Sequence, residues 1–119
     1  MIPIGPATRV FLAPGATDLR KGFDGLNDLV RHQLREDPLS GHLFVFSNRA
    51  RNRVKVVYWD GSGTWILAKR LARGCFSWPR AGGPAEPAAR RILAEELTLL
   101  LGGIDLEKTR SRDWWRKAA

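Results

Sequence analysis

The sequence predicts an α+β fold, in which a small antiparallel sheet of about four strands forms a meander and carries two helices. Short apolar runs separated by Gly and Pro recur between residues 9 and 79, as expected for strands joined by turns. Two longer stretches, at residues 18–35 and 88–101, instead repeat their apolar residues with a helical period. One helix therefore comes from the N-terminal half and packs on the sheet, and the other is C-terminal.

Length and composition predict a single globular domain. The chain has 119 residues, of which 44% are hydrophobic and 27% charged, so it has enough apolar residues to form a core. We expect the domain to span residues 1–106. A Gly- and Pro-rich linker at 80–87 precedes the C-terminal helix, and a basic tail occupies 107–119.

Cysteine usage and hydropathy predict a cytoplasmic protein. Cys75 is the only cysteine, so no intramolecular disulfide can form. No apolar run approaches the roughly 20 residues of a membrane span, and the N-terminus does not resemble a signal peptide. We therefore expect no membrane partner.

The first half of the chain predicts a strand, a helix and a central strand. Residues 9–13 form a β-rich run that ends at a Pro-Gly turn, and Thr17 is a candidate N-cap for the helix over 18–35. The apolar face of that helix comprises Leu19, Phe23, Leu26, Val30 and Leu34. Residues 42–47 are apolar on both faces, which predicts a central strand that is covered on both sides.

The second half predicts a hairpin, a short edge strand and the C-terminal helix. Strands at 54–60 and 64–71 are joined by a turn at Asp60-Gly61-Ser62-Gly63. Residues 75–79 are expected to add a short edge strand that ends at Pro79. The helix over 88–101 ends at Gly102-Gly103.

Charge indicates a polyanionic partner. Lys and Arg total 20 against 12 Asp and Glu, which gives a net charge of +8 and a pI near 10.8. This excess favours nucleic acid first and an anionic membrane surface second. The alternative is a basic protein from an arginine-rich genome.

Two basic stretches are the candidate nucleic-acid contacts. In an extended chain, alternating basic residues over 49–55 would line one face about 6.6–7 Å apart, close to the spacing of successive phosphates. A second group follows the hairpin, where cations are interleaved with aromatic residues that could stack on bases. The predicted contact residues are Arg49, Arg51, Arg53, Lys55, Lys69, Arg70, Arg73 and Trp78. The alternative is that the aromatic residues belong to the core, which we favour for Trp59 and Phe76, and that the arginines form a solvated rim.

No catalytic constellation is evident, so the sequence predicts neither an enzyme nor a cofactor. His32 and His42 lie on different predicted elements, and no metal-ligand spacing occurs. Gly61-Ser62-Gly63 is followed by a strand, whereas a phosphate-binding loop leads into a helix. The aspartates are scattered, and Asp60 is best explained as the corner of the hairpin.

Several sequence blocks carry a family resemblance. They are Asp18-Leu19-Arg20-Lys21-Gly22-Phe23-Asp24-Gly25-Leu26, the stretch 40–46, Trp59-Asp60-Gly61-Ser62-Gly63, the residues Lys69-Arg70-Leu71 with Gly74, Phe76, Trp78 and Pro79, and the helix end at 100–105. In this order they resemble the TnpB (second open reading frame) accessory proteins of IS-sixty-six-class bacterial insertion sequences. The match covers about residues 9–106. Cys75 and Gly102 depart from the pattern.

The resemblance implies a small accessory protein that is encoded beside a separate transposase and is needed for transposition. It brings no catalytic residues. Our first hypothesis is non-catalytic contact with DNA at the ends of the element, without a small-molecule substrate. The second is an adaptor that binds the transposase or the other accessory protein through Leu97, Leu100 and Leu101 of the C-terminal helix.

Overall fold

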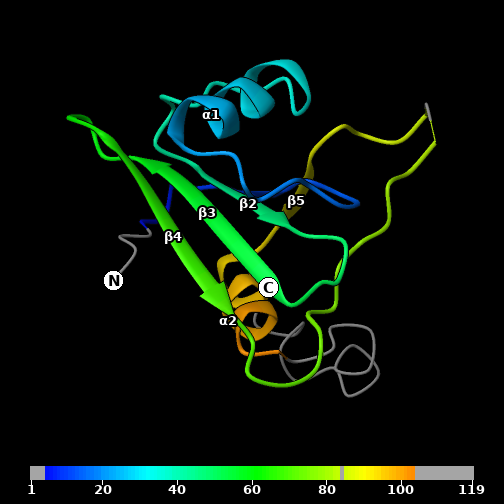
Figure 1. The fold of residues 1–119 in the computed structure, drawn as a ribbon. Coiled ribbons are helices and arrows are strands. Elements are labelled where there is room, and N and C mark those ends of the chain that lie inside the picture. The colour runs from blue at the N-terminus through cyan, green and yellow to red at the C-terminus, as the bar shows by residue number, and fades with distance from the viewer. Residues whose placement is uncertain (1–4, 84, 104–119) are drawn as a thin grey trace.

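The computed structural model describes residues 5–83 and 85–103. They form a five-stranded sheet and two helices: β1 (Val10–Leu12), α1 (Phe23–His32), β2 (Leu43–Ser47), β3 (Arg53–Trp59), β4 (Thr64–Arg70), β5 (Arg90–Ile92) and α2 (Ala94–Leu101). The strand order is β4-β3-β2-β1-β5, and α1 and α2 lie on opposite faces of the sheet (Figure 1). The predicted basic tail at 107–119 lies outside the described residues.

The α+β class is confirmed, although the sheet has five strands instead of about four and is mixed. β2, β3 and β4 form the predicted antiparallel meander. β1, however, pairs with β2 in parallel, with Val10 opposite Leu43. The connection between β1 and β2 contains α1, and such a crossover is what allows two successive strands to run in the same direction.

β2 is the central strand, as predicted, and its two faces belong to two cores. Phe44 and Phe46 pack with Leu26 and Val30 of α1. On the other face, a second core combines Leu43 and Val45 with α2 and with two aromatic residues from the segment after β4; it includes Phe76, Trp78, Leu97 and Leu100. All five residues of β2 are buried, because a helix covers each side.

Helix α1 is shorter than the predicted 18–35 helix, and Thr17 is not its N-cap. Thr17 is buried, and its amide donates to the carbonyl of Ser47 (2.8 Å), which holds the chain along the end of β2. The Asp18 carboxylate accepts from the Arg20 amide (3.0 Å), which forms a turn instead of a helix. Gly22 precedes the helix, without a side-chain cap.

The predicted helix over 88–101 is wrong in its first part. Residues 90–92 form β5, which pairs antiparallel with β1, and α2 begins at Ala94. The exposed edge of β1 supplies backbone partners to this segment, and tertiary pairing outweighs local helix propensity. The carboxylate of Glu96 accepts from the amide of Leu93 (3.1 Å) and fixes the start of the helix.

The predicted edge strand at 75–79 is also wrong. These residues form no strand, although they are held by single backbone bonds such as the one from the Phe76 amide to the Arg51 carbonyl (2.6 Å). Phe76 is buried, as favoured from the sequence, and Cys75 is exposed. Within the described part of the chain, no helix is long and apolar enough to cross a membrane.

Candidate nucleic-acid interface

Three connections meet at one end of the sheet. They are the segment 17–21 after β1, the turn 48–52 between β2 and β3, and the segment 71–76 after β4. Thr17 bonds to the end of β2, whereas the amides of Leu71 and Phe76 donate to the carbonyls of Asn52 (2.8 Å) and Arg51 (2.6 Å). These bonds bring together segments that are far apart in the sequence.

The turn 48–52 is built by Asn48. Its side-chain oxygen accepts from the amides of Asn52 and Arg53 (both 3.1 Å), and its amide nitrogen donates to the Asn52 side chain (2.8 Å). Arg51 adopts a positive φ of 58° within this turn. The predicted extended row of basic residues over 49–55 is therefore wrong: Arg49 lies in the turn with Arg51, and β3 begins at Arg53.

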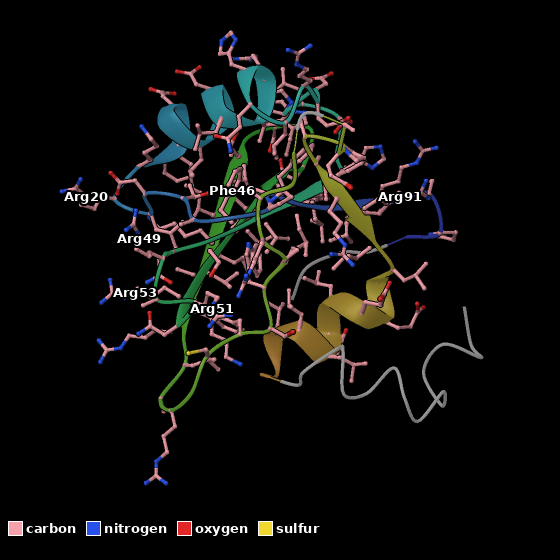
Figure 2. All side chains as sticks on the ribbon, turned by 90° about the vertical axis from the view of Figure 1, so that its right-hand side faces the viewer. Arg20, Phe46, Arg49, Arg51, Arg53 and Arg91 are labelled. Atoms are coloured by element: carbon pink, nitrogen blue, oxygen red, sulfur yellow. The ribbon has the colours of Figure 1, made fainter. Side chains whose placement is uncertain are left out.

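Cations nevertheless gather at this end of the sheet. We call the basic edge the set of Arg20, Lys21, Arg49, Arg51, Arg53, Lys55, Arg70 and Arg73, which come from these three connections and from the adjoining ends of β3 and β4. Figure 2 shows Arg20, Arg49, Arg53 and Arg51 along one side of the molecule. Arg20 and Lys21 were missed as sequence candidates because the helix was expected to begin at Asp18, which made them ordinary helix surface charges.

A hollow of about 560 Å³ lies within the basic edge. Its cationic lining includes Arg20, Arg53, Lys55 and Arg70, and Asp18 is its acidic member. Arg53 lies directly opposite Arg70 in the β3–β4 register. Among the described residues, neither of these two arginines forms an ion pair. Like charges that face each other across strands repel, so the pair favours an anionic ligand.

Asp18 orients Arg20 at the rim of this hollow. Its carboxylate accepts from Nε of Arg20 (3.0 Å) and from Nη2 (2.9 Å), which leaves the other guanidinium N–H groups for a ligand. These side-chain hydrogen bonds lower the pKa of Asp18 to about 2. Nearby, the ammonium of Lys55 donates to the Lys21 carbonyl (3.1 Å) and ties β3 to the segment before α1.

Lys69 also lines the hollow, but its ammonium is directed elsewhere, and Trp78 is not part of the basic edge. Lys69 lies opposite Val54, on the face of the sheet that carries α2, and its ammonium donates to the Leu101 carbonyl (2.6 Å) at the end of that helix. Trp78 is only 7% exposed, and its Nε1 donates to the Ala13 carbonyl (2.9 Å). The expectation that Trp78 stacks on bases is therefore wrong, because its ring lies in the core.

The leucines of the adaptor hypothesis lie mostly inside the protein. Leu97 is 2% exposed and Leu100 is fully buried, because both face the sheet. Leu101 is partly buried against the same core. A partner that binds this helix would therefore have to use other residues.

Asp60 is the corner of the hairpin, as predicted. Its carboxylate accepts four hydrogen bonds, from the amide and hydroxyl of Ser62, the amide of Gly63 and Nε1 of Trp65, at 2.8–2.9 Å. These bonds hold its pKa well below the usual range, with the Ser62 amide as the largest cause. In the described residues, no three His, Cys, Asp or Glu side chains gather as metal ligands would.

These features define a small α+β protein whose sheet is covered by a helix on each face and carries a group of cations at one end. Comparison with known proteins specifies the family: residues 8–111 match the model of the IS66 Orf2 like protein, and the chain belongs to this family. It is therefore an accessory protein of a bacterial insertion sequence.

Two relatives come from Sinorhizobium fredii. The chain is 44% identical to the uncharacterized protein y4hO over 105 residues, which are 88% of each chain. It is 35% identical to the uncharacterized protein y4jC over 111 residues, which are 92% of each chain. No solved structure matches the chain significantly.

Proposed function

We propose that the protein contacts DNA of its insertion sequence, at the ends of the element, through the basic edge and catalyses no reaction there. The observation that carries this proposal is the pair Arg53 and Arg70, which face each other in a hollow and form no ion pair in the described chain. Phosphate oxygens would remove the repulsion between the two guanidinium groups and accept charge-assisted hydrogen bonds from both.

The shape of the hollow is consistent with phosphate contact. With a volume of about 560 Å³ and a lining from β3, β4 and the segment before α1, it can admit phosphates of a backbone that passes over it. Phosphate contacts position a protein on DNA and carry no base sequence by themselves. We therefore expect binding that depends strongly on salt and weakly on sequence.

Two aspartates support a non-catalytic role: Asp18 at the basic edge, and Asp60 in the hairpin turn at the other end of β3 and β4. Asp18 is bound by Arg20, and Asp60 already accepts four hydrogen bonds. A general base or metal ligand needs an available oxygen, and both aspartates instead use their oxygens to shape a turn.

The salt dependence of DNA affinity tests the basic edge. For wild type, log K for a duplex with the sequence of an element end should fall linearly with log salt concentration. The Arg53→Ala and Arg70→Ala double variant should have a shallower slope, by about 0.9 for each phosphate that the missing guanidinium groups no longer neutralise.

The control variant, Arg31→Ala and Arg35→Asn, also removes two positive charges, but from α1 and the segment that follows it. Asn suits position 35 because Arg35 has a positive φ of 57°. The control should keep the wild-type slope. Equal slopes in all three proteins would refute a role for Arg53 and Arg70.

A second proposal is that the protein is an adaptor for the transposase or the other accessory protein. The observation in its favour is Trp65, which is 58% exposed although its Nε1 is fixed by Asp60 (2.8 Å). A rigid exposed aromatic side chain is a common anchor in protein interfaces. In a pull-down with the cognate transposase, Trp65→Ser should lose binding while the Arg53 and Arg70 variant retains it. The reverse pattern would refute this surface.

A further inference from the structure

A second basic surface lies along the β5 edge of the sheet, away from the strand ends that carry the basic edge. β5 is the outermost strand there, and its residues Arg90 and Arg91 are both exposed. Because these two residues lie opposite Leu12 and Phe11, their side chains leave the edge toward opposite faces of the sheet. Figure 2 shows Arg91 on the side of the molecule opposite to Arg20, Arg49, Arg51 and Arg53.

A third arginine reaches this edge from another segment. Arg80 lines the same hollow as Arg90 and Arg91, with a volume of about 730 Å³, and the acidic residue in its lining is Glu86. In the described chain, none of the three arginines forms an ion pair. Charged residues on an edge strand often serve to prevent pairing between sheets. That role does not account for Arg80, which belongs to no strand.

The position of Arg80 is set by contacts of the residues that precede and follow it in the chain. The Gly15 amide donates to the Pro79 carbonyl (2.9 Å), and the preceding Trp78 bonds to Ala13 (2.9 Å). Gly15 has a φ of +80°, and a Cβ at this residue would lie 3.2 Å from Cβ of Ala81. This close approach anchors the loop of Arg80 against the segment after β1, beside the hollow that Arg90 and Arg91 also line.

The two basic surfaces are far enough apart to act separately. Arg70 is offset from Arg90 by three residues along the strands. In addition, four strand spacings of about 4.8 Å separate β4 from β5 by about 19 Å across the sheet. That distance is close to the width of a DNA duplex. We propose that Arg80, Arg90 and Arg91 bind the phosphates of a second DNA segment, so that a single protein molecule holds two duplexes at once. This inference rests on the proposed DNA contact of the basic edge.

A bridging assay tests this inference. One duplex is fixed to beads, a second labelled duplex is free, and the full chain is added at low salt. Wild type should capture the label. The triple variant Arg80→Gln, Arg90→Gln, Arg91→Gln should capture about tenfold less labelled duplex, or still less, because three phosphate-binding cations are removed. It should still bind the duplex on the beads. Arg→Lys changes at the same positions should restore capture, and the Arg31→Ala and Arg35→Asn control should keep it.

Stoichiometry separates this arrangement from bridging by a dimer. In sedimentation with excess short duplex, wild type should bind two duplexes per chain, and the triple Gln variant one. Capture that persists in the triple variant would overturn the second site and leave the basic edge intact. So would wild type that binds only one duplex per chain, whether or not it captures a second duplex as a dimer. Wild type that binds no duplex at all would overturn the proposed function as well.

Discussion

Trp78 shows that an aromatic residue in a basic stretch can have a purely structural role. In the sequence it lies between Arg73 and Arg80, which suggested stacking on bases. In the structure its indole fills the core on the α2 face, and its Nε1 bonds to Ala13. A buried indole N–H usually requires a partner, and the Ala13 carbonyl supplies it.

Asp60 gives a prediction on pH. The hydrogen bonds that it accepts lower its pKa in the folded protein, and Arg20 lowers the pKa of Asp18 to about 2. The unfolded chain therefore binds more protons in acid than the folded protein does, so the free energy of unfolding should fall as the pH drops below about 4. Above that pH the stabilisation is fully present.

Urea denaturation over a range of roughly pH 2 to 6, which spans the ordinary pKa of an aspartate, measures this effect. Asp60→Asn should lower stability at neutral pH, because the Asn nitrogen cannot accept from Trp65, and should weaken the loss in acid. The Asp28→Asn variant is the control, since Asp28 has only a long contact of 3.9 Å with Arg31. A pH profile of Asp60→Asn parallel to that of wild type would contradict the prediction.

At the scale of elements, the segment 88–101 shows how pairing divides a helical pattern. Its first part pairs with β1 as β5, and its second part forms α2 over the core. The division at Leu93 turns Arg90 and Arg91 into edge-strand residues. On a continuous helix they would instead have been neighbours on its surface.

Because α2 begins directly after Leu93, substitution by Asp should affect protein stability differently at Leu93 and at Leu97. Leu97→Asp would bury a charge in the core and should lower the free energy of unfolding by several kcal/mol, roughly 3 or more. Leu93 is 38% exposed and precedes the first turn of α2, where Asp is a favourable N-cap. Leu93→Asp should therefore be neutral or stabilising.

Thermal and urea unfolding of the two variants check this prediction. Failure of Leu97→Asp to bind a partner would be meaningful only if the variant remained folded. Equal stability of the Leu97→Asp variant and wild type would contradict the burial of this residue.

At the scale of the molecule, both cores share the same sheet. Leu26 packs on one face and Leu100 on the other, and β2 contributes side chains to both. The two faces should therefore unfold together, as expected if the predicted domain of residues 1–106 is a single cooperative unit.

Single substitutions in each core test this cooperativity. Leu26→Ala and Leu100→Ala should each lower stability by about 2–5 kcal/mol, because both side chains are fully buried. Tryptophan fluorescence and circular dichroism should report the same transition in each variant. Leu39→Ala, at a residue that is 46% exposed, is the control and should change little. Separate transitions by the two probes would divide the protein into two units.

The sequence by itself determined what depends on neighbouring residues. The Asp60 turn and the β3–β4 hairpin follow from the Gly positions, because a tight turn needs backbone conformations that Gly adopts easily. The double-sided burial of β2 follows from its unbroken apolar pattern. The basic character of the protein follows from composition alone.

Only the tertiary structure decided which distant segments meet. The parallel pairing of β1, the position of β5, the burial of Trp78 and the gathering of Arg20 with Arg53 and Arg70 all depend on contacts between remote residues. Local patterns do not specify such contacts, since several pairings can satisfy the same propensity and a shift of one residue reverses the faces of a strand. The packing of both cores on one sheet selects the arrangement that places one basic surface at an end of the sheet and the other along its β5 edge.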